Sequence, residues 1–346
     1  MILVLNCGST SIKWKVFNLP AQAGAKLKPV QEGQCSVTDQ NLFQKFLEIE
    51  LAKVDRTNIT LVGHRVVHGS DKFISPIKID ENNLSELEKI SHLAPLHNPF
   101  NILTIKTCQN IFKDVSQFAV FDTEFFANLP EKASTYPLPE EIVKEFGFKR
   151  YGFQGTSHEF AARKAAEMVK KPISKLKIIT CHLGGGASTA AIKNGKAVDT
   201  SMGFTPLEGL VMMTRSGNID AGIVLELVRE FSLDKASEIL NKQSGIKGIC
   251  GDSDMLRVLD RVSVGDEKAK LALDVFVYSI QKYIGGYFAI LGGCDLLVFT
   301  GAIGYGSAKI RNMITKNLDI LKKTKILAIK NDEELAIAAK VLSIKY

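Results

Sequence analysis

The 346-residue chain has no segment that predicts insertion into a membrane. None of its apolar runs approaches the roughly 18 uninterrupted residues that a membrane-spanning helix requires. The first residues, Met1–Leu5, are apolar, but no basic residue precedes them and Asn6 follows at once. This run is shorter than the apolar core of a signal peptide. It therefore predicts a strand.

Cysteine is present but never closely paired. The six cysteines are scattered, and no two of them form a C-x-x-C motif. This spacing argues against a zinc site and against a disulfide framework. Cysteines without such patterns fit a reducing compartment, so we expect a cytoplasmic protein. The six are Cys7, Cys35, Cys108, Cys181, Cys250 and Cys294.

The chain also lacks a long basic run, although its formal net charge is +7. A positive net charge favours anionic partners in general. Because the lysines are spread along the chain, no cluster marks a nucleic-acid surface. We therefore expect small anionic ligands and no nucleic acid.

The composition is ordinary for a soluble globular enzyme, with 45% hydrophobic and 23% charged residues. The length predicts about two domains. No low-complexity linker separates them, so the boundary must fall between Asp122 and Gly155. Within that interval, Pro137-Leu-Pro139 marks a break in regular structure.

Each half of the chain contains two short apolar strands joined by a turn rich in glycine and serine. In chain order these segments are Ile2–Asn6, Gly8–Ser11, Ile12–Phe17, Lys177–Cys181, His182–Ser188 and Thr189–Lys193. The second half continues through the tight turn Asn194-Gly195 into Lys196–Thr200. Two further buried strands, Phe118–Phe121 and Leu296–Phe299, end in polar residues or glycine. This recurrence predicts an internal duplication.

The two glycine-rich turns predict phosphate binding. Glycine lets backbone N–H groups approach phosphate oxygens without a Cβ in the way. Neither turn is a Walker A motif or a G-x-G-x-x-G motif, so P-loop and Rossmann folds find no support.

Helical segments alternate with the strands, so the fold class is α/β. The expected helices are Asn83–Ile90, Asn98–Gln109, Glu140–Glu145, Glu159–Val169, Ile223–Phe231, Asp234–Asn241, Glu267–Gly285 and Ile310–Leu321.

Several other segments are dense in polar residues and glycine that a core does not need. They are Gly63–Gly69, Leu93–Pro99, Phe121–Thr123, Arg150–His158, Asp199–Leu210 and Thr214–Asp220. In this order, and from Asn6 to Glu334, the chain resembles the acetate kinase family of the acetate and sugar kinase/Hsp70/actin superfamily. The resemblance implies two duplicated ribonuclease-H-like (actin-like ATPase) domains with a nucleotide cleft between them.

The resemblance also implies which function each domain has. Residues 1–148 together with 331–346 would form an N-terminal domain for the acyl substrate. Residues 149–330 would form a domain for nucleotide binding and dimerisation. Members of the family are usually homodimers, so we expect a homodimer.

The implied activity is that of a short-chain carboxylate kinase. ATP and acetate, or propionate, would react reversibly by direct in-line phosphoryl transfer to give ADP and an acyl phosphate. The implied cofactor is Mg²⁺ or Mn²⁺, and ATP is a co-substrate. Two alternatives stay open: a kinase for butyrate or another short acid, and a weakly active paralogue that binds nucleotide.

Site residues follow from the resemblance by position. The catalytic set is Asp122, Arg65, Arg215, His97 and Gln154. The metal residues are Asn6 and Glu333, and the small acyl pocket contains Arg65, Val67, Leu96, Phe153 and Pro206. The nucleotide residues are Lys13, His182, Leu183, Gly184, Gly185, Gly186, Ala302, Ile303, Gly304, Tyr305 and Gly306.

The chain departs from the family pattern at four places. Gln154 stands where the family has a histidine that donates to the phosphoryl group, and an amide can donate but cannot become cationic. Gly185 replaces an asparagine in the nucleotide loop. Ala302–Gly306 replaces Gly-Ile-Gly-Glu-Asn, and Leu256 stands where the family has an arginine, with Arg257 one place later. We expect the activity to be reduced rather than absent, and the affinity for ATP or the nucleotide preference to differ from that of the family.

Overall fold

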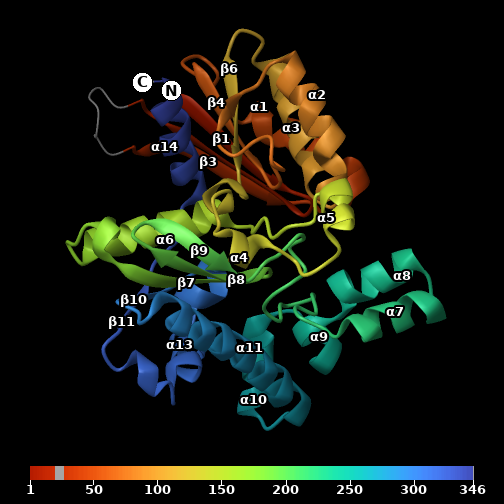
Figure 1. The fold of residues 1–346 in the computed structure, drawn as a ribbon. Coiled ribbons are helices and arrows are strands. Elements are labelled where there is room, and N and C mark those ends of the chain that lie inside the picture. The colour runs from red at the N-terminus through yellow and green to blue at the C-terminus, as the bar shows by residue number, and fades with distance from the viewer. Residues whose placement is uncertain (20–26, 346) are drawn as a thin grey trace. The chain divides into compact units, whose positions relative to one another are not determined.

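The computed structural model of the protein describes residues 1–19 and 27–345, and strands and helices alternate along most of this length (Figure 1). Two units divide the chain. Unit 1 comprises Met1–Ala127, Gln154–Thr156 and Asp332–Tyr346. Unit 2 comprises Asn128–Phe153 and Ser157–Asn331.

Unit 1 is built on a six-stranded sheet in the order β3-β2-β1-β4-β6-β5. The strands are β1 (Ile2–Gly8), β2 (Ser11–Phe17), β3 (Pro29–Ser36), β4 (Leu61–Val66), β5 (Ile77–Lys78) and β6 (Ser116–Phe121). The first three strands form an antiparallel meander, while β4 runs parallel to β1 and β6 runs parallel to β4.

Unit 2 is built on a five-stranded sheet in the order β11-β10-β7-β8-β9. Its strands are β7 (Lys177–Leu183), β8 (Ala187–Lys193), β9 (Lys196–Thr200), β10 (Leu296–Thr300) and β11 (Lys325–Ala328). Here too the first three strands form an antiparallel meander, β10 is parallel to β7, and β11 is parallel to β10. The two sheets therefore repeat one topology, which confirms the predicted α/β class and duplication.

Helices cover both faces of the sheet in unit 1. They are α1 (Phe43–Ala52), α2 (Glu81–Lys89), α3 (Asn98–Ile111) and α14 (Glu333–Lys345). In β1, Leu3 and Leu5 join the core cluster that contains residues of α1 and α3. Ile2 and Val4 join the cluster that contains residues of α14. A strand that is buried on both faces reads as a continuous apolar run, which explains the N-terminal sequence.

Helices also accompany the sheet of unit 2, and α6 begins with two residues that belong to unit 1. The helices are α4 (Glu131–Ser134), α5 (Glu140–Phe146), α6 (Gly155–Met168), α7 (Ala221–Glu230), α8 (Leu233–Glu238), α9 (Gly245–Cys250), α10 (Met255–Ser263), α11 (Glu267–Leu291), α12 (Gly301–Gly306) and α13 (Ala308–Thr315). The long helix α11 packs against β8 and α9. It ends at Gly292, whose left-handed φ of 65° gives a common C-terminal cap. Among the helices of the described residues, none has the length and apolar character to cross a bilayer.

Four expected helices differ clearly in extent. Helix α6 begins at Gly155, four residues before the expected start at Glu159. The expected helix Ile310–Leu321 is wrong in its second half, because α13 ends at Thr315 and Asn317 adopts a left-handed φ of 68°. The expected helix Asp234–Asn241 is α-helical only to Glu238, and a π-helical turn follows. Helix α11 continues beyond Gly285, because a glycine within a helix weakens it without ending it.

Candidate active site

Arg65 and Asp122 lie at the carboxyl ends of neighbouring parallel strands in unit 1. Arg65 is in β4, and Asp122 directly follows β6. Arg65 Nε and Nη2 donate to the same oxygen, Asp122 Oδ2, at 3.0 and 2.5 Å. The ends of parallel strands are where α/β sheets place ligands. A guanidinium fixed in this way presents its remaining donors in a defined direction.

The start of α6 presses against Asp122. Gly155 N donates to the Asp122 carbonyl oxygen at 2.9 Å, and Thr156 Oγ1 donates to Asp122 Oδ1 at 3.3 Å. A Cβ on Gly155 would lie 2.3 Å from that carbonyl oxygen, so only glycine fits here without a shift. Asp122 is 1% exposed. Its carboxylate is therefore held from two sides, by Arg65 and by Thr156.

Asn6 connects Arg65 to the first turn of α14. Its Nδ2 donates to Glu333 Oε2 and to Glu334 Oε1, both at 2.8 Å, and its Oδ1 accepts from Arg65 Nη1 at 3.1 Å. Burial works to lower the pKa of Arg65, but the charges of Asp122 and Glu333 outweigh it and raise that pKa above its ordinary value. The guanidinium therefore stays charged. Asn6 and Glu333, the two residues expected to hold a metal, are in direct contact.

The chemistry of this pair suits magnesium. Mg²⁺ prefers oxygen ligands and usually keeps several waters, so one or two carboxylates suffice. Glu333 is only partly buried, so water reaches it. No group of three or more His, Cys, Asp or Glu side chains within the described residues is arranged as a complete metal cage. The Asn6 amide and the Glu333 carboxylate both offer oxygen donors of the kind that Mg²⁺ takes.

Gln154 has an uncommon backbone conformation. Its φ of 59° is in the left-handed region, which few residues other than glycine adopt. It directly precedes α6, within unit 1. Strained positions of this kind gather at functional sites, so the outlier supports a hypothesis of function for Gln154.

The other expected residues of unit 1 are placed as follows. His97 is half-buried and forms the N-cap position of α3. Val67 is buried, whereas Leu96 is 40% exposed. Lys13 is exposed on β2, opposite Asn6 in the β1–β2 register. Phe153 and Pro206, the other two apolar pocket residues, belong to unit 2.

In unit 2, the glycine-rich turn and α12 lie side by side. The turn joins β7 to β8, and Gly184 N donates to Gly186 O at 3.1 Å. Gly301 has a left-handed φ of 79°, and a Cβ there would lie 2.5 Å from Leu183 O. An ideal Cβ on Gly185 would meet no atom within 4 Å, so there is open space beside the turn. Two segments expected to bind nucleotide, residues 182–186 and 302–306, are thus adjacent. The second of them lies in helix α12.

Two neighbouring histidines, His158 and His182, have ring centroids 6.4 Å apart. His182 Nδ1 and Ser157 Oγ are 2.6 Å apart, and Ser157 Oγ also accepts from Asn331 Nδ2 at 2.9 Å. His158 is buried between Thr180 Oγ1 and Ser188 Oγ, each 2.7 Å from one of its ring nitrogens. Burial, and then the neighbouring His182, hold the pKa of His158 well below its ordinary value. His158 therefore acts as a neutral link between α6, β7 and β8.

Arg215 is a cation without an acidic partner among the described residues. Its Nη1 donates to Pro206 O at 3.2 Å and lies 4.0 Å from Met212 Sδ. Burial lowers the pKa of Arg215, and no nearby carboxylate counteracts that shift. A desolvated guanidinium without a counterion is costly in a folded protein. This arrangement suits a residue whose partner is an anionic ligand.

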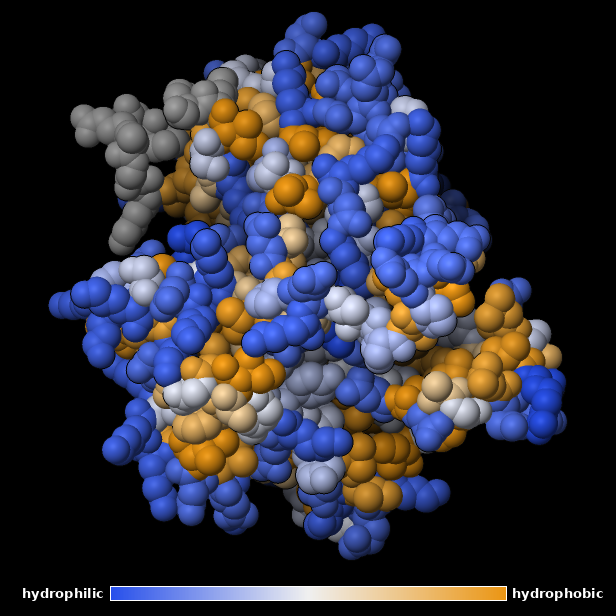
Figure 2. Space-filling model, in the orientation of Figure 1, coloured by the Kyte–Doolittle hydropathy of each residue, from blue (hydrophilic) through white to orange (hydrophobic). Residues whose placement is uncertain are grey.

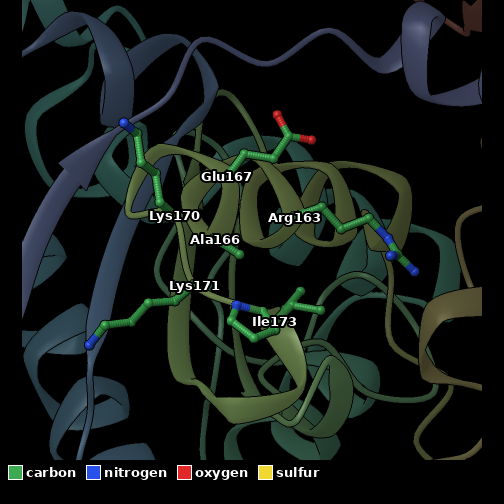
Figure 3. Close-up of a pocket in the computed structure, with 7 residues that line it drawn as sticks. Arg163, Ala166, Glu167, Lys170, Lys171 and Ile173 are labelled. Atoms are coloured by element: carbon green, nitrogen blue, oxygen red, sulfur yellow. The ribbon is translucent and has the colours of Figure 1, made fainter. Parts of the chain in front are cut away.

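A separate surface pocket of about 350 Å³ lies at the end of α6 in unit 2. It is lined by Arg163, Ala166, Glu167, Lys170, Lys171, Pro172 and Ile173. Its charged side chains point away from one another rather than converge (Figure 3). A ligand site needs convergent polar groups, so this pocket is not the candidate active site.

The site and the duplicated fold define a phosphotransferase, and comparisons with known proteins identify its family. The sequence model of the Acetokinase family matches residues 38–342. The acetate kinase of Carboxydothermus hydrogenoformans is 41% identical over an alignment of 393 positions, which covers 99% of this chain and 98% of the relative. Because the alignment is longer than this chain, the relative has internal segments that this chain lacks.

Two solved structures agree. Porphyromonas gingivalis acetate kinase matches with a TM-score of 0.88 and 34% identity, covering 100% of this chain and 99% of that one. A propionate kinase from Francisella tularensis matches with a TM-score of 0.86 and 35% identity, covering 98% of each chain. The chain belongs to the acetokinase family, as predicted. It is a short-chain carboxylate kinase, a phosphotransferase with a carboxyl group as acceptor.

Three further residues belong to the unit 1 network, although the sequence motifs do not identify them. Glu334 and Thr156 bind Asn6 and Asp122 directly, and Lys15 contacts Glu334. Glu334 and Thr156 lie beside residues that the motifs identified, so their proximity in sequence was an available signal. Lys15 had no comparable signal, because only folding brings it next to α14.

Proposed function

We propose that the protein transfers the γ-phosphoryl group of ATP to acetate or propionate and releases ADP and the acyl phosphate. The observation that carries this proposal is the network of Asn6, Arg65, Asp122 and Glu333. Asn6 and Glu333 are 327 residues apart in sequence. A buried ion pair adds little to the free energy of folding, because desolvation of the charges offsets their attraction. A cluster of charged groups such as this one is therefore better explained by function than by stability.

In this proposal Asp122 orients Arg65. A carboxylate substrate has already lost its proton near neutral pH, because its pKa is close to that of a free side-chain carboxyl. A general base is therefore unnecessary. Phosphoryl transfer depends mainly on positioning and on charge neutralisation. The two hydrogen bonds from Arg65 to one oxygen of Asp122 support a positioning role.

Asn6 and Glu333 would hold Mg²⁺, directly or through water, and Mn²⁺ would substitute for it. When bound, the metal neutralises charge on the phosphate oxygens. His97 and Gln154 would contact the transferring phosphoryl group, with Gln154 as a neutral donor. Its left-handed backbone is the feature that supports this role.

The nucleotide would bind to unit 2 at residues 182–186 and 302–306. The support is the contact between these segments and the open space at Gly185. Lys13, the remaining nucleotide residue, is on unit 1. Arg215 would pair with the phosphoryl group or with the substrate carboxylate, for which a planar fork of donors is suited. Its lack of an acidic partner among the described residues supports this assignment.

The acyl chain would meet Val67, Leu96, Phe153 and Pro206. The matched relatives include proteins named acetate kinase and one named propionate kinase. One methylene in an apolar pocket changes discrimination by only about 1–3 kcal/mol. We therefore propose both acids as substrates.

We further propose that the active form is a cytoplasmic homodimer. Helix α7 buries none of its side chains against the described residues, although its sequence is largely apolar. The space-filling view shows an apolar surface over α7 and α8 (Figure 2). Ile223, Leu225, Val228, Phe231 and Leu233 are between 36% and 71% exposed. Such a patch marks an interaction surface. All six cysteines are free thiols, which supports a reducing compartment.

The test is an acyl phosphate assay. The purified protein is incubated with Mg-ATP and acetate, propionate or butyrate, and hydroxylamine traps any acyl phosphate as a hydroxamate. Product with acetate or propionate supports the proposal. Product with butyrate alone would identify butyrate, and not acetate or propionate, as the substrate. Nucleotide binding without product from any acid would favour a paralogue that only binds nucleotide.

A further inference from the structure

The chain segment that follows β4 is held by side chains. Strand β4 ends at Val66, and the next three residues, 67–69, are buried. Each of their N–H groups donates to a side-chain oxygen at 3.1 Å. The acceptors for Val67, His68 and Gly69 are, in this order, Asn101 Oδ1, Asn98 Oδ1 and Thr123 Oγ1. A buried backbone N–H needs a partner, so these bonds fix the course of the segment.

The amide of Asn101 also bonds to β1. Asn101 Nδ2 donates to the Cys7 carbonyl oxygen at 2.8 Å, and Asn101 is 1% exposed. Strands β1 and β4 are parallel neighbours, and Leu5 with His64 is the last residue pair of their ladder. Cys7 and Val67 lie beyond this pair. The side-chain amide therefore joins the two strands where the ladder has ended, with its donor toward β1 and its acceptor toward the end of β4.

The residues beside this link belong to the proposed site. Cys7 directly follows Asn6, and Val67 lies two residues after Arg65. Asn6 Oδ1 accepts from Arg65 Nη1 at 3.1 Å. The Asn101 amide thus bonds to the backbone beside Asn6 and to the backbone of Val67, a residue of the proposed acyl pocket. These two bonds fix how far Val67 lies from the pair formed by Asn6 and Arg65.

Asn98 offers a comparison within the same helix. Helix α3 packs against β1 and β4, and Asn98 and Asn101 are about one turn apart on it. Asn98 Oδ1 accepts from His68 N at 3.1 Å, and its Nδ2 donates to His68 O at 3.0 Å. Both asparagines therefore satisfy one buried N–H group and one buried carbonyl group. The bonds of Asn98 go to a single residue, whereas those of Asn101 connect two strands.

We infer that Asn101 is a positioning residue that sets the depth of the acyl pocket and thereby limits the length of the acid that reacts. The inference rests on the proposed carboxylate kinase activity and on the proposed pocket role of Val67. Arg65 and Val67 are expected to line the same pocket, so the room for an alkyl tail depends on the distance between them. Asn101 fixes that distance through the Val67 N–H group. Without this bond, Val67 can yield to a longer chain.

The test compares acids of different length. Acyl phosphate formation from acetate, propionate and butyrate is measured by hydroxylamine trapping at saturating Mg-ATP. The value of kcat/KM for each acid is taken from the initial slope, which does not require saturation with the acid. The ratio of kcat/KM for butyrate to that for acetate is independent of the fraction of folded enzyme, so a loss of stability alone leaves it unchanged. We expect Asn101→Ala to raise this ratio about tenfold, within the range that methylene groups contribute to discrimination.

A second readout separates the acid from the nucleotide. The proposed nucleotide residues 182–186 and 302–306 belong to unit 2, whereas Asn101 belongs to unit 1. We therefore expect the KM for ATP to change little in Asn101→Ala. Val67→Ala should raise the butyrate-to-acetate ratio as Asn101→Ala does, because it deepens the same pocket directly.

Matched variants complete the test. Asn98→Ala removes an identical side chain with the same two kinds of bond, and it should change the ratio much less. Thr107→Val removes a buried hydroxyl of α3 that donates to Leu103 O, and it should leave the ratio unchanged. Asn101→Ser leaves room for a water at the Val67 N–H group, so it should fold even if Asn101→Ala does not. Because a water holds Val67 less firmly than the amide, Asn101→Ser should also raise the ratio.

The outcomes separate the inference from the proposed function. If the wild type forms no acyl phosphate from any acid, the proposed function is wrong and the inference falls with it. If the wild type is active and Val67→Ala keeps the wild-type ratio, Val67 does not limit the acid and the inference alone is wrong. If Asn101→Ala and Asn101→Ser lower kcat/KM equally for acetate and butyrate, Asn101 has only a structural role. An equal shift of the ratio in Asn98→Ala would also overturn the inference, because general loosening of residues 67–69 would then be the cause.

Discussion

Arg65 binds Asp122 through two donors that converge on a single carboxylate oxygen, Oδ2. The second oxygen, Oδ1, accepts from Thr156 at the start of α6. Asp122 therefore connects the end of β4 to the residues that follow Gln154. A change at Asp122 should affect the orientation of Arg65 before it affects the fold.

Asp122→Asn is expected to lower kcat by at least about 100-fold, the size of the loss when a preorganised electrostatic group is removed. The amide keeps the volume of the carboxylate but not its charge, so Arg65 loses its fixed partner. Hydroxamate formation under saturating substrates measures kcat, and circular dichroism checks the fold. Turnover close to wild type in a folded Asp122→Asn protein would contradict the proposed role.

Gly155→Ala is expected to lower kcat about 10- to 100-fold, because small displacements near the reacting groups are costly. The new Cβ would lie 2.3 Å from the Asp122 carbonyl oxygen and 2.9 Å from Phe125 Cβ, so Asp122 or α6 must move. Gly285→Ala in α11 is the matched control. Its Cβ meets nothing within 4 Å, and alanine should stabilise the helix by about 1 kcal/mol. Equal kinetics in the two variants would show that the packing of α6 on Asp122 is unimportant.

The parts of the fold and site that follow local rules could be predicted from the sequence. Glycine-rich turns between apolar strands indicated the duplication, and polar residues after strands indicated Asp122. The link from Lys15 to Asp332 could not be predicted, because it joins residues 317 positions apart and no periodicity reports such a contact. Helix α12 could not be predicted from the sequence either. Its glycines suggest a loop, yet Gly301 is needed for its left-handed φ and for the close approach of the helix to Leu183 O.

Gln154→His is expected to raise kcat about fivefold. A hydrogen bond to a charged group contributes about 1 kcal/mol more than one between neutral groups, and only histidine can become cationic. The gain should grow as pH falls from 7.5 to 6.5, since the imidazole gains its proton in that range. Hydroxamate formation across this range measures the effect. A rate that is unchanged at every pH would mean that the residue at position 154 does not approach the phosphoryl group.

Leu225→Glu is expected to convert the proposed dimer into a monomer. Leu225 is 71% exposed on α7, and a charge placed in an apolar interface lacks a partner when it is desolvated. Analytical ultracentrifugation of both proteins gives the masses directly. Ile74→Glu is the control, because Ile74 is an exposed apolar residue (51%) that belongs to unit 1. If the Leu225→Glu variant is still a dimer, the interface lies elsewhere. If the wild-type protein is a monomer, the proposed dimer is wrong.

His64 should make unit 1 sensitive to acid. Burial lowers the pKa of His64 to about 4, although its hydrogen bond with Gln117 acts in the opposite direction. In the unfolded chain the pKa is about 6.5, so the unfolded state binds a proton that the folded state excludes. The free energy of unfolding is therefore undiminished above pH 6.5 and falls as the pH drops toward 4. His64 alone should account for about 2 kcal/mol between pH 6.5 and pH 5.

Urea unfolding at several pH values measures this effect. Trp14 is the single tryptophan of the chain and lies in unit 1, so its fluorescence reports the unfolding of the unit that contains His64. His64→Gln removes the titrating group, and its stability should fall less steeply with acid than that of the wild type. His92→Gln, at an exposed position, should keep the wild-type slope. Glutamine cannot take up the proton that His64 binds when the wild type unfolds. If His64→Gln nevertheless keeps the wild-type slope, the acid sensitivity of unit 1 has another source.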